Sequence, residues 1–170
     1  YTTDQTEYVM TYAEVQFILA EAALKGWGVG GTAESYYNAG IEASMSKWGV
    51  TSADVTTYLS HLLVAYDDTK ANEQIGTQKW LALYTQGIEA FTEVRRTGYP
   101  AVIESYELPA TVYPGLGVPL RFPYPLSESS RNGANYDLAT AGIHNDMYGK
   151  PLWWDTRTTK ADGSARPGID

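Results

Sequence analysis

Residues 71–100 read ANEQIGTQKWLALYTQGIEAFTEVRRTGYP, the longest stretch of the sequence in which a helical hydrophobic period runs without an internal proline. Large apolar residues recur there at steps of three and four, the spacing of one face of an amphipathic helix. They are Trp80, Tyr84, Ile88, Phe91 and Val94. Arg95 and Arg96 oppose the negative end of the helix dipole, and Gly98, with Pro100 two residues later, stops the helix. The stretch therefore predicts one amphipathic helix that ends near Thr97, with the other segments packed on it.

Three further helices are predicted before this stretch. The first runs from Thr11 to Gly26 and opens with a possible capping box of Thr11 and Glu14. The second runs from Thr32 to Trp48, and the third from about Ser52 to Tyr66. Small residues in the second helix, among them Gly40, leave room for a neighbouring helix to approach closely. The residues expected to face the core are Tyr12, Val15, Ile18, Leu19, Ala22, Ala23, Tyr37, Ile41, Met45, Trp48, Val55, Leu59, Leu62 and Leu63.

These segments predict two antiparallel helix pairs, which begin at Thr11 and at about Ser52. They resemble tetratricopeptide (TPR) hairpins, although their spacing exceeds the ~34 residues of a strict repeat. All eight prolines lie in residues 100–170, so long helices are excluded there and residues 118–125 are restricted to an edge strand or a polyproline-like segment. The prediction is a mainly α fold in a single domain. It has a helical scaffold over 11–98 and a proline-rich loop and short-strand segment over 99–170.

The composition argues against several functional classes. The 170 residues carry a formal net charge of -8, which disfavours nucleic acids and anionic membrane surfaces as partners. There is no cysteine, and no apolar run approaches the ~20 residues that span a bilayer. The opening YTTDQTEYV is neither a signal nor a transit peptide, so we expect a chain cut from something longer or already processed. The sequence has 14 Tyr and 5 Trp but only 3 Phe. This preference is typical of surfaces partly exposed to water, such as protein interfaces and sugar-binding sites.

No motif points to a cofactor or a metal. The glycine-rich loop at 26–31 follows a predicted helix rather than a strand and lacks the Gly-Lys-Ser/Thr of a phosphate loop, so it reads as a tight turn between helices. His61 and His144 are too few and too far apart in sequence to suggest metal ligation by spacing. A structural role is the better interpretation of His61. We therefore expect no cofactor and no metal site.

Carboxylate pairs are the remaining catalytic candidates. Glu89 and Glu93 lie one turn apart on the same predicted helix, whereas glycoside hydrolysis needs two carboxylates that flank the scissile bond. Adjacent positions on one helix face do not provide that arrangement. Three oxygen-bearing side chains in a later loop suggest a calcium cluster, but turn and capping roles fit their spacing better. They are Asn132, Asn135 and Asp137.

Aromatic side chains in predicted loops are the candidate ligand contacts. Their flat faces suit stacking on the apolar face of a pyranose ring, while polar neighbours bond its hydroxyl groups. For each of them, ordinary packing is the competing interpretation. The candidates are Trp27, Tyr113, Tyr148, Trp153 and Trp154.

A structural ion pair is also predicted. Glu21 lies among the apolar residues of the first helix, and a buried carboxylate needs a partner. Arg95 and Arg96 are the obvious candidates for that partner, and exposure of Glu21 to solvent is the alternative.

Several runs of residues resemble the SusD/RagB family of outer-membrane nutrient-binding lipoproteins, in the order of the C-terminal half of that family. They cover nearly the whole chain. They are MTYAEV (10–15) with AEA (20–22), YNAGI (37–41), QKWLAL (78–83), GIEAF (87–91), RRTGYP (95–100), PLRFPYP (119–125) with Glu128 and Asn135-Tyr136, and LWWD (152–155).

The resemblance implies a TPR-like scaffold that is lipid-anchored at the surface of a Bacteroides-type bacterium. Such proteins bind glycans or other nutrients and act as a lid on a SusC-like TonB-dependent transporter, delivering the ligand without cleaving it. Family members are longer and carry an N-terminal lipoprotein cysteine, which this sequence lacks. The matching runs are scaffold motifs, so the resemblance assigns no binding residue. Two other functions stay open from the residues alone: a TPR-like protein-protein interaction module and a glycoside hydrolase.

Overall fold

The computed structural model describes residues 8–104, 118–141, 151–161 and 163–166. Within these ranges the regular elements are helices, and the β-pairing consists of one antiparallel bridge between Thr159 and Ala165. The mainly α prediction is therefore confirmed, and residues 118–125 form no strand. The chain divides into two compact units, Tyr1–Pro100 and Ala101–Asp170.

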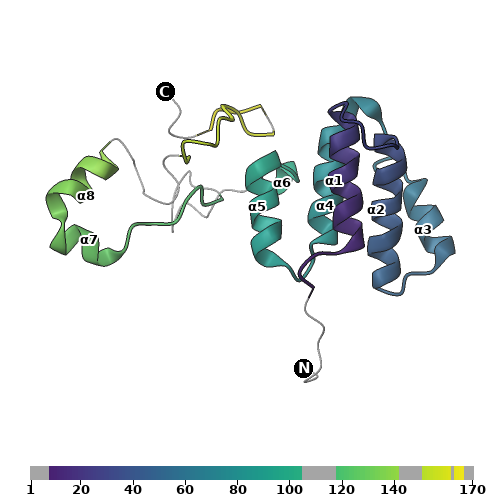
Figure 1. Cartoon of the computed structure of the whole chain (residues 1–170), viewed down its shortest axis with the longest axis horizontal. Coiled ribbons are helices and arrows are strands. Elements are labelled where there is room, and N and C mark those ends of the chain that lie inside the picture. Colours follow the sequence, from purple (N-terminus) through teal and green to yellow (C-terminus); the bar gives the residue numbers. More distant parts are fainter. Residues whose placement is uncertain (1–7, 105–117, 142–150, 162, 167–170) are drawn as a thin grey trace, which may run out of the picture. The chain divides into compact units, whose positions relative to one another are not determined.

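The first unit consists of helices connected by short turns (Figure 1). Its elements are α1 (Tyr12–Leu24), α2 (Ala33–Lys47), α3 (Ser52–Leu59), the 3-10 turn η1 (Asp68–Lys70), α4 (Ala71–Ala82) and α5 (Gly87–Thr97). Helices α1 and α2 form an antiparallel hairpin, and α4 packs against both of them. Helix α5 packs on α4, so the hairpins fit the predicted TPR-like arrangement.

Threonine hydroxyl groups fix the starts of the first three helices. Thr11 accepts a hydrogen bond from the backbone N–H of Glu14 at 3.2 Å. Thr32 and Ser35 form a reciprocal capping box, and Thr51 caps α3. Because these hydroxyls satisfy backbone donors that the helix leaves free, local sequence determines where the helices begin.

The core of this unit lies where α1 crosses α2. Phe17 and Tyr37 are completely buried, with ring centroids 6.3 Å apart. A Cβ atom on Gly40 would lie 2.8 Å from Cζ of Phe17, so only glycine lets the two helices approach to this distance. The Tyr37 hydroxyl donates to the carbonyl of Val64 at 2.8 Å, which ties the segment after α3 to the core.

The predicted helix over residues 71–97 is wrong as a single element. It is divided into α4 and α5 by a turn in which Thr85 adopts a left-handed backbone with φ of 76°. Tyr84 and Ile88, which belong to the apolar face of the predicted helix, are exposed. Helix α4 instead buries a face that includes polar side chains. Gln74 makes this possible, because its amide donates to the Ala65 carbonyl at 2.8 Å and accepts from the Asp67 N–H at 2.9 Å.

Other predicted core positions also differ from the structure, among them Trp48 at the end of α2, which is exposed. In α1 the buried face contains Phe17 rather than Tyr12 and Ile18, both of which are exposed. The third helix ends at Leu59 rather than Tyr66. The chain turns after α3 so that Val64 reaches the core, and its predicted inward residues Leu62 and Leu63 point to solvent.

The second unit has short helices and irregular segments. Its helices are α6 (Ala101–Glu104), α7 (Leu126–Arg131) and α8 (Gly133–Thr140). In the suggested calcium loop, the Asn135 amide donates to Asn132 Oδ1 at 2.6 Å. Among the described residues, no group of three or more His, Cys, Asp or Glu side chains is arranged to hold a metal ion.

Candidate functional site

A polar cleft of about 350 Å³ opens on the helical unit between α1, α4 and α5. Its volume lies at the lower end of the range of small-molecule sites, roughly 300–1,000 Å³. Ile75 and Gly76 give it an apolar part. The polar lining residues are Glu21, Lys25, Asn72, Glu93, Arg96, Thr97 and Tyr99.

The segment that follows α5 shapes this cleft. Gly98 ends α5 in the left-handed conformation, with φ of 84°, and the Thr97 hydroxyl accepts from the Tyr99 N–H at 3.1 Å. A Cβ atom on Gly76 would lie 2.9 Å from Cβ of Tyr99, so the glycine in α4 leaves space for Tyr99. The residues that stop the helix thus also place an aromatic side chain in the cleft lining.

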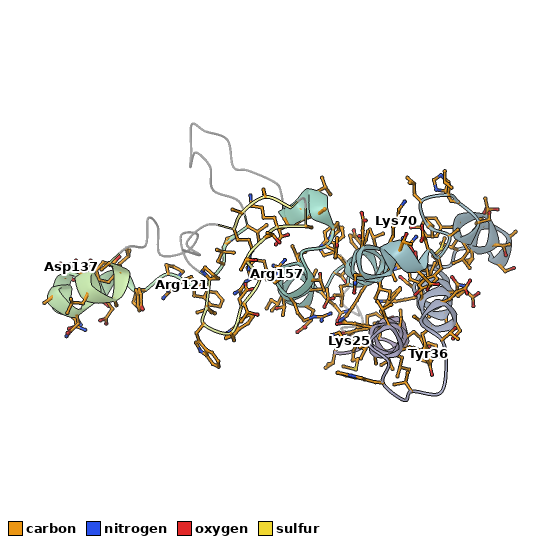
Figure 2. All side chains as sticks on the ribbon, turned by 90° about the horizontal axis from the view of Figure 1, so that it is seen from above. Lys25, Tyr36, Lys70, Arg121, Asp137 and Arg157 are labelled. Carbon is orange, nitrogen blue, oxygen red and sulfur yellow. The ribbon has the colours of Figure 1, made fainter. Side chains whose placement is uncertain are left out.

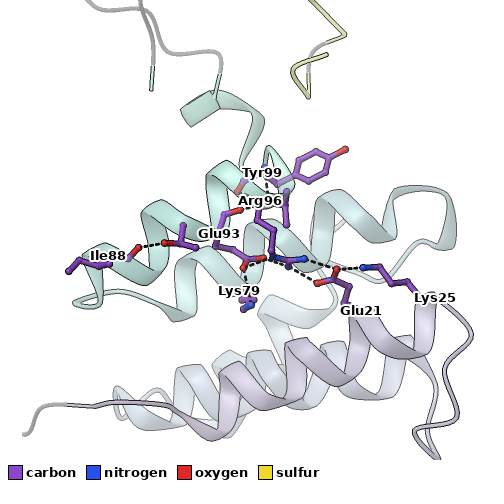
Figure 3. Close-up of polar contacts among 9 residues, drawn as sticks. Glu21, Lys25, Lys79, Ile88, Glu93, Arg96 and Tyr99 are labelled. Atoms are coloured by element: carbon purple, nitrogen blue, oxygen red, sulfur yellow. Dashed lines mark hydrogen bonds and ion pairs between the residues drawn. The ribbon is translucent and has the colours of Figure 1, made fainter. Parts of the chain in front are cut away.

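A network of charged hydrogen bonds crosses the cleft (Figure 3). The Arg96 guanidinium donates to both oxygens of Glu21, at 2.7 and 2.6 Å, and to Glu93 Oε1 at 2.7 Å. Lys25 donates to Glu21 at 2.7 Å, and Lys79 donates to Glu93 at 2.9 Å. The side chains of Glu93 and Lys79 are only 6% and 10% exposed, so this end of the network is buried. Each carboxylate therefore has two cationic partners, and the network joins α1, α4 and α5.

The structure brings Glu21 together with Arg96, one of its two predicted partners. The other, Arg95, has its guanidinium 5.4 Å from the centroid of the Phe91 ring. The hydrogen bond from Arg96 holds the pKa of Glu21 at about 2, against the opposing effect of its partial burial and with a further contribution from Lys25. The same pairing with Glu21 raises the pKa of Arg96 above its ordinary value.

Trp27, the predicted ligand contact in the helical unit, lies beside this cleft. The ammonium of Lys25, a lining residue labelled in Figure 2, lies 5.7 Å from the centroid of the Trp27 ring. The Trp27 N–H bonds to the Ala22 carbonyl at 3.0 Å, and Tyr36 donates to the carbonyl of Val29 in the same loop at 2.6 Å. The loop is therefore tied to both helices of the hairpin, while the Trp27 side chain stays 66% exposed.

The other candidate aromatic residues do not belong to the described part of the cleft unit. Tyr113 and Tyr148 lie outside the described residues. Trp153 and Trp154 belong to the second unit and are 91% and 49% exposed.

Sequence reasoning missed Asn72, Tyr99 and the pairing of Glu93. The signal available for Tyr99 was its place directly after the glycine stop of α5. Asn72 had no such signal, because it becomes part of a cleft only when α4 packs on α1.

The arrangement suits binding of a polar ligand better than acid-base catalysis. Glu21 and Glu93 both line the cleft, but each carboxylate is bound by two cations. A glycosidase needs a carboxylic acid with a raised pKa to protonate the leaving group. Glu21 has a lowered pKa, so it stays ionised at neutral pH and is unsuited to that role.

The ionisation of Glu21 predicts a specific dependence of stability on pH. Its pKa falls from 4.5 to about 2 on folding, so its contribution to stability is complete above its ordinary pKa and is lost as the pH falls towards 2. Urea unfolding should therefore show a difference between the wild type and Glu21→Gln that is largest near neutral pH and shrinks steadily below pH 4.5. A difference that does not change with pH in this range would contradict the assignment.

Comparison with known proteins places the chain in a family. A SusD-like family model with the description "Starch-binding associating with outer membrane" matches residues 1–125. The chain therefore belongs to the SusD-like family, as the sequence runs that resemble it predicted. Among proteins with curated functions, none matches the sequence.

Solved structures support the same placement. A SusD-like protein from Bacteroidetes is 31% identical over 87% of this chain, with a TM-score of 0.72. A SusD homologue from Bacteroides fragilis is 34% identical over 88% of the chain, with a TM-score of 0.65. A chitin-binding SusD homologue from Flavobacterium johnsoniae is 27% identical over 95% of the chain, with a TM-score of 0.66. This chain spans only 30%, 35% and 38% of the length of these three proteins.

The family is one of carbohydrate-binding proteins associated with the outer membrane. In the described residues, no helix combines the length and apolar character needed to cross a bilayer.

Proposed function

We propose that this chain contributes to a surface-exposed glycan-binding lipoprotein, which binds oligosaccharides without cleaving them and passes them to a SusC-like TonB-dependent transporter. The observation that carries the proposal is the match to a starch-binding, outer-membrane-associating family over residues 1–125. The lipid anchor and the transporter partner are proposed for the whole protein. The similar solved proteins are more than twice as long as this chain.

The cleft beside Trp27 is the proposed sugar contact of the helical unit. Carboxylate, guanidinium, ammonium and amide groups converge there, and such groups bond the hydroxyls of a sugar ring. The exposed indole of Trp27 supplies an apolar face next to them, on which a pyranose can stack. Among the side chains that line the cleft, the charges of Glu21 and Glu93 balance those of Lys25 and Arg96, so the cleft suits a neutral glycan.

The ligand class follows from the relatives. The family description names starch, and one of the similar structures is a chitin-binding protein. Both ligands are neutral polymers of pyranose rings, in agreement with the balanced charge of the cleft. We therefore propose an α-glucan or a chitin-type oligosaccharide as the ligand.

The test is calorimetric titration of the chain with maltoheptaose and with chitohexaose. Trp27→Ala should weaken binding about tenfold, which corresponds to about 1.4 kcal/mol of lost stacking. Trp48→Ala is the matched control, because Trp48 is similarly exposed but contacts Tyr84, with ring centroids 5.5 Å apart, instead of lining the cleft. Equal effects of both substitutions would contradict the cleft as the site.

Reducing ends are measured in the same samples. No increase is expected, and their appearance would overturn the proposal of binding without cleavage. Absence of binding to both ligands by the wild type would show that this chain does not carry the sugar site.

A further inference from the structure

Trp153 occupies the tip of a tight turn in the second unit. The Asp155 N–H donates to the Leu152 carbonyl at 2.9 Å, so Trp153 and Trp154 are the two central residues of the turn. The Trp153 side chain is 91% exposed, although an indole is one of the largest apolar groups available for burial. An almost fully exposed tryptophan therefore lies at a defined position in the chain.

A buried ion pair holds the end of this turn. The Arg166 guanidinium donates to both oxygens of Asp155, at 2.7 and 2.8 Å, and the two side chains are 2% and 3% exposed. Bidentate pairs of this kind fix orientation as well as distance. Burial raises the pKa of Asp155, but the hydrogen bonds and charge of Arg166 outweigh it, so the net pKa is lowered and the carboxylate stays ionised.

Further contacts connect this pair to the rest of the unit. Arg157, labelled in Figure 2, forms an ion pair with Glu104 at 2.8 Å. Glu104 also accepts from the Ala161 N–H at 2.6 Å, and Arg166 donates to the Arg157 carbonyl at 3.2 Å. The segment from 155 to 166 is therefore tied to α6 and to itself by charged groups. None of these contacts involves the side chain of Trp153, so the network fixes the turn without burying that ring.

We propose that Trp153 is a second sugar-stacking residue, presented by the turn that the Asp155–Arg166 pair holds. The inference rests on the proposed glycan-binding function and adds a contact in a different unit from the cleft. Because the backbone of the turn is fixed before the ligand arrives, little backbone conformational entropy is lost on binding.

The surroundings favour a sugar over a protein partner. In an assembled protein interface, a tryptophan hot spot is surrounded by contacts that exclude water. The residues that follow Asp155 are instead exposed threonines, Thr156, Thr158 and Thr159, which suit a wet contact with hydroxyl groups.

The test is an NMR titration of the ¹⁵N-labelled full chain with maltoheptaose and chitohexaose, in which the indole N–H signals of the tryptophans are recorded. Single Trp→Phe substitutions assign the signals. We expect the Trp153 signal to shift on sugar addition, and Trp153→Ala to weaken binding about fivefold, consistent with loss of one stacking contact.

A shift of the Trp27 signal while the Trp153 signal stays unmoved would overturn this inference and leave the proposed function standing. No shift of any tryptophan signal would overturn both. A Trp153 signal that neither sugar shifts, but that a protein partner does shift, would overturn the inference in favour of a protein interface.

A second variant tests whether Asp155 positions Trp153. Asp155→Asn removes the charge that Arg166 binds and is expected to reduce the sugar-induced shift of Trp153 while leaving the Trp27 response unchanged. Asp137→Asn, an exposed position on α8, is the matched control. A Trp153 response that Asp155→Asn leaves intact would contradict the positioning role.

Discussion

Replacement of Glu93 by alanine is expected to lower the free energy of unfolding by about 3–5 kcal/mol, the cost of breaking a buried ion pair on one side. Glu93 bonds both Lys79 and Arg96, and it is nearly inaccessible to water. Without its carboxylate the ammonium of Lys79 stays buried and loses its charge partner. Urea unfolding followed by circular dichroism measures the change.

Two variants separate charge burial from other effects of this substitution. Glu89→Ala removes an exposed carboxylate one turn earlier on α5 and should change the stability by less than about 0.5 kcal/mol. Glu93→Leu combined with Lys79→Met replaces both charges with apolar groups of similar size, and it should recover much of the loss. A loss from Glu93→Ala no greater than that from Glu89→Ala would contradict the importance of the buried pair.

Replacement of Phe17 by alanine should destabilise the helical unit by about 3–5 kcal/mol, because it opens a cavity where α1 crosses α2. The Phe17 ring is completely buried and lies between the backbone at Gly40 and the ring of Tyr37. Thermal and urea unfolding both report the change.

The neighbouring residue provides the control. Ile18 lies on the same helix but is 41% exposed, so Ile18→Ala should cost well under half as much. The sequence pattern assigned Ile18 to the core and left Phe17 out of it. Equal losses from the two substitutions would contradict the orientation of α1 in the structure.

The starts of the helices could be predicted from sequence, since capping depends on residues three positions apart. Thr11 and Thr32, the first residues of the first two predicted helices, are the N-caps of α1 and α2 in the structure. The division of the helix over 71–97 could not be predicted in the same way. Tyr84 and Ile88 continue a helical period on both sides of Thr85, and nothing in that period marks the left-handed residue.

The buried face of α4 shows why apolar periodicity was misleading. Gln74 is buried because its amide bonds to Ala65 and Asp67, which follow α3. Gln78 is buried because its amide bonds to Tyr58 in α3. Hydropathy alone cannot identify such positions, because burial depends on partners that only the fold brings near.

The candidate site was predictable in parts. Glu21 was predicted to form an ion pair because it is a carboxylate among apolar residues. Its partner in the structure, Arg96, is one of the two predicted arginines. Trp27 was named for its chemistry and its place in a loop. Its proximity to the cleft depends on the packing of α1, α4 and α5, which the sequence did not specify.

The bond between Glu21 and Arg96 joins residues 75 positions apart, on the first and last helices of the first unit. In helical repeat arrays each repeat touches only its neighbours, so the array can fray from either end. Here α1 also packs on α4, and the charged bridge fastens it to α5. Neither terminal helix can detach without breaking contacts with the other end of the unit. The helical unit should consequently melt in one cooperative step rather than helix by helix.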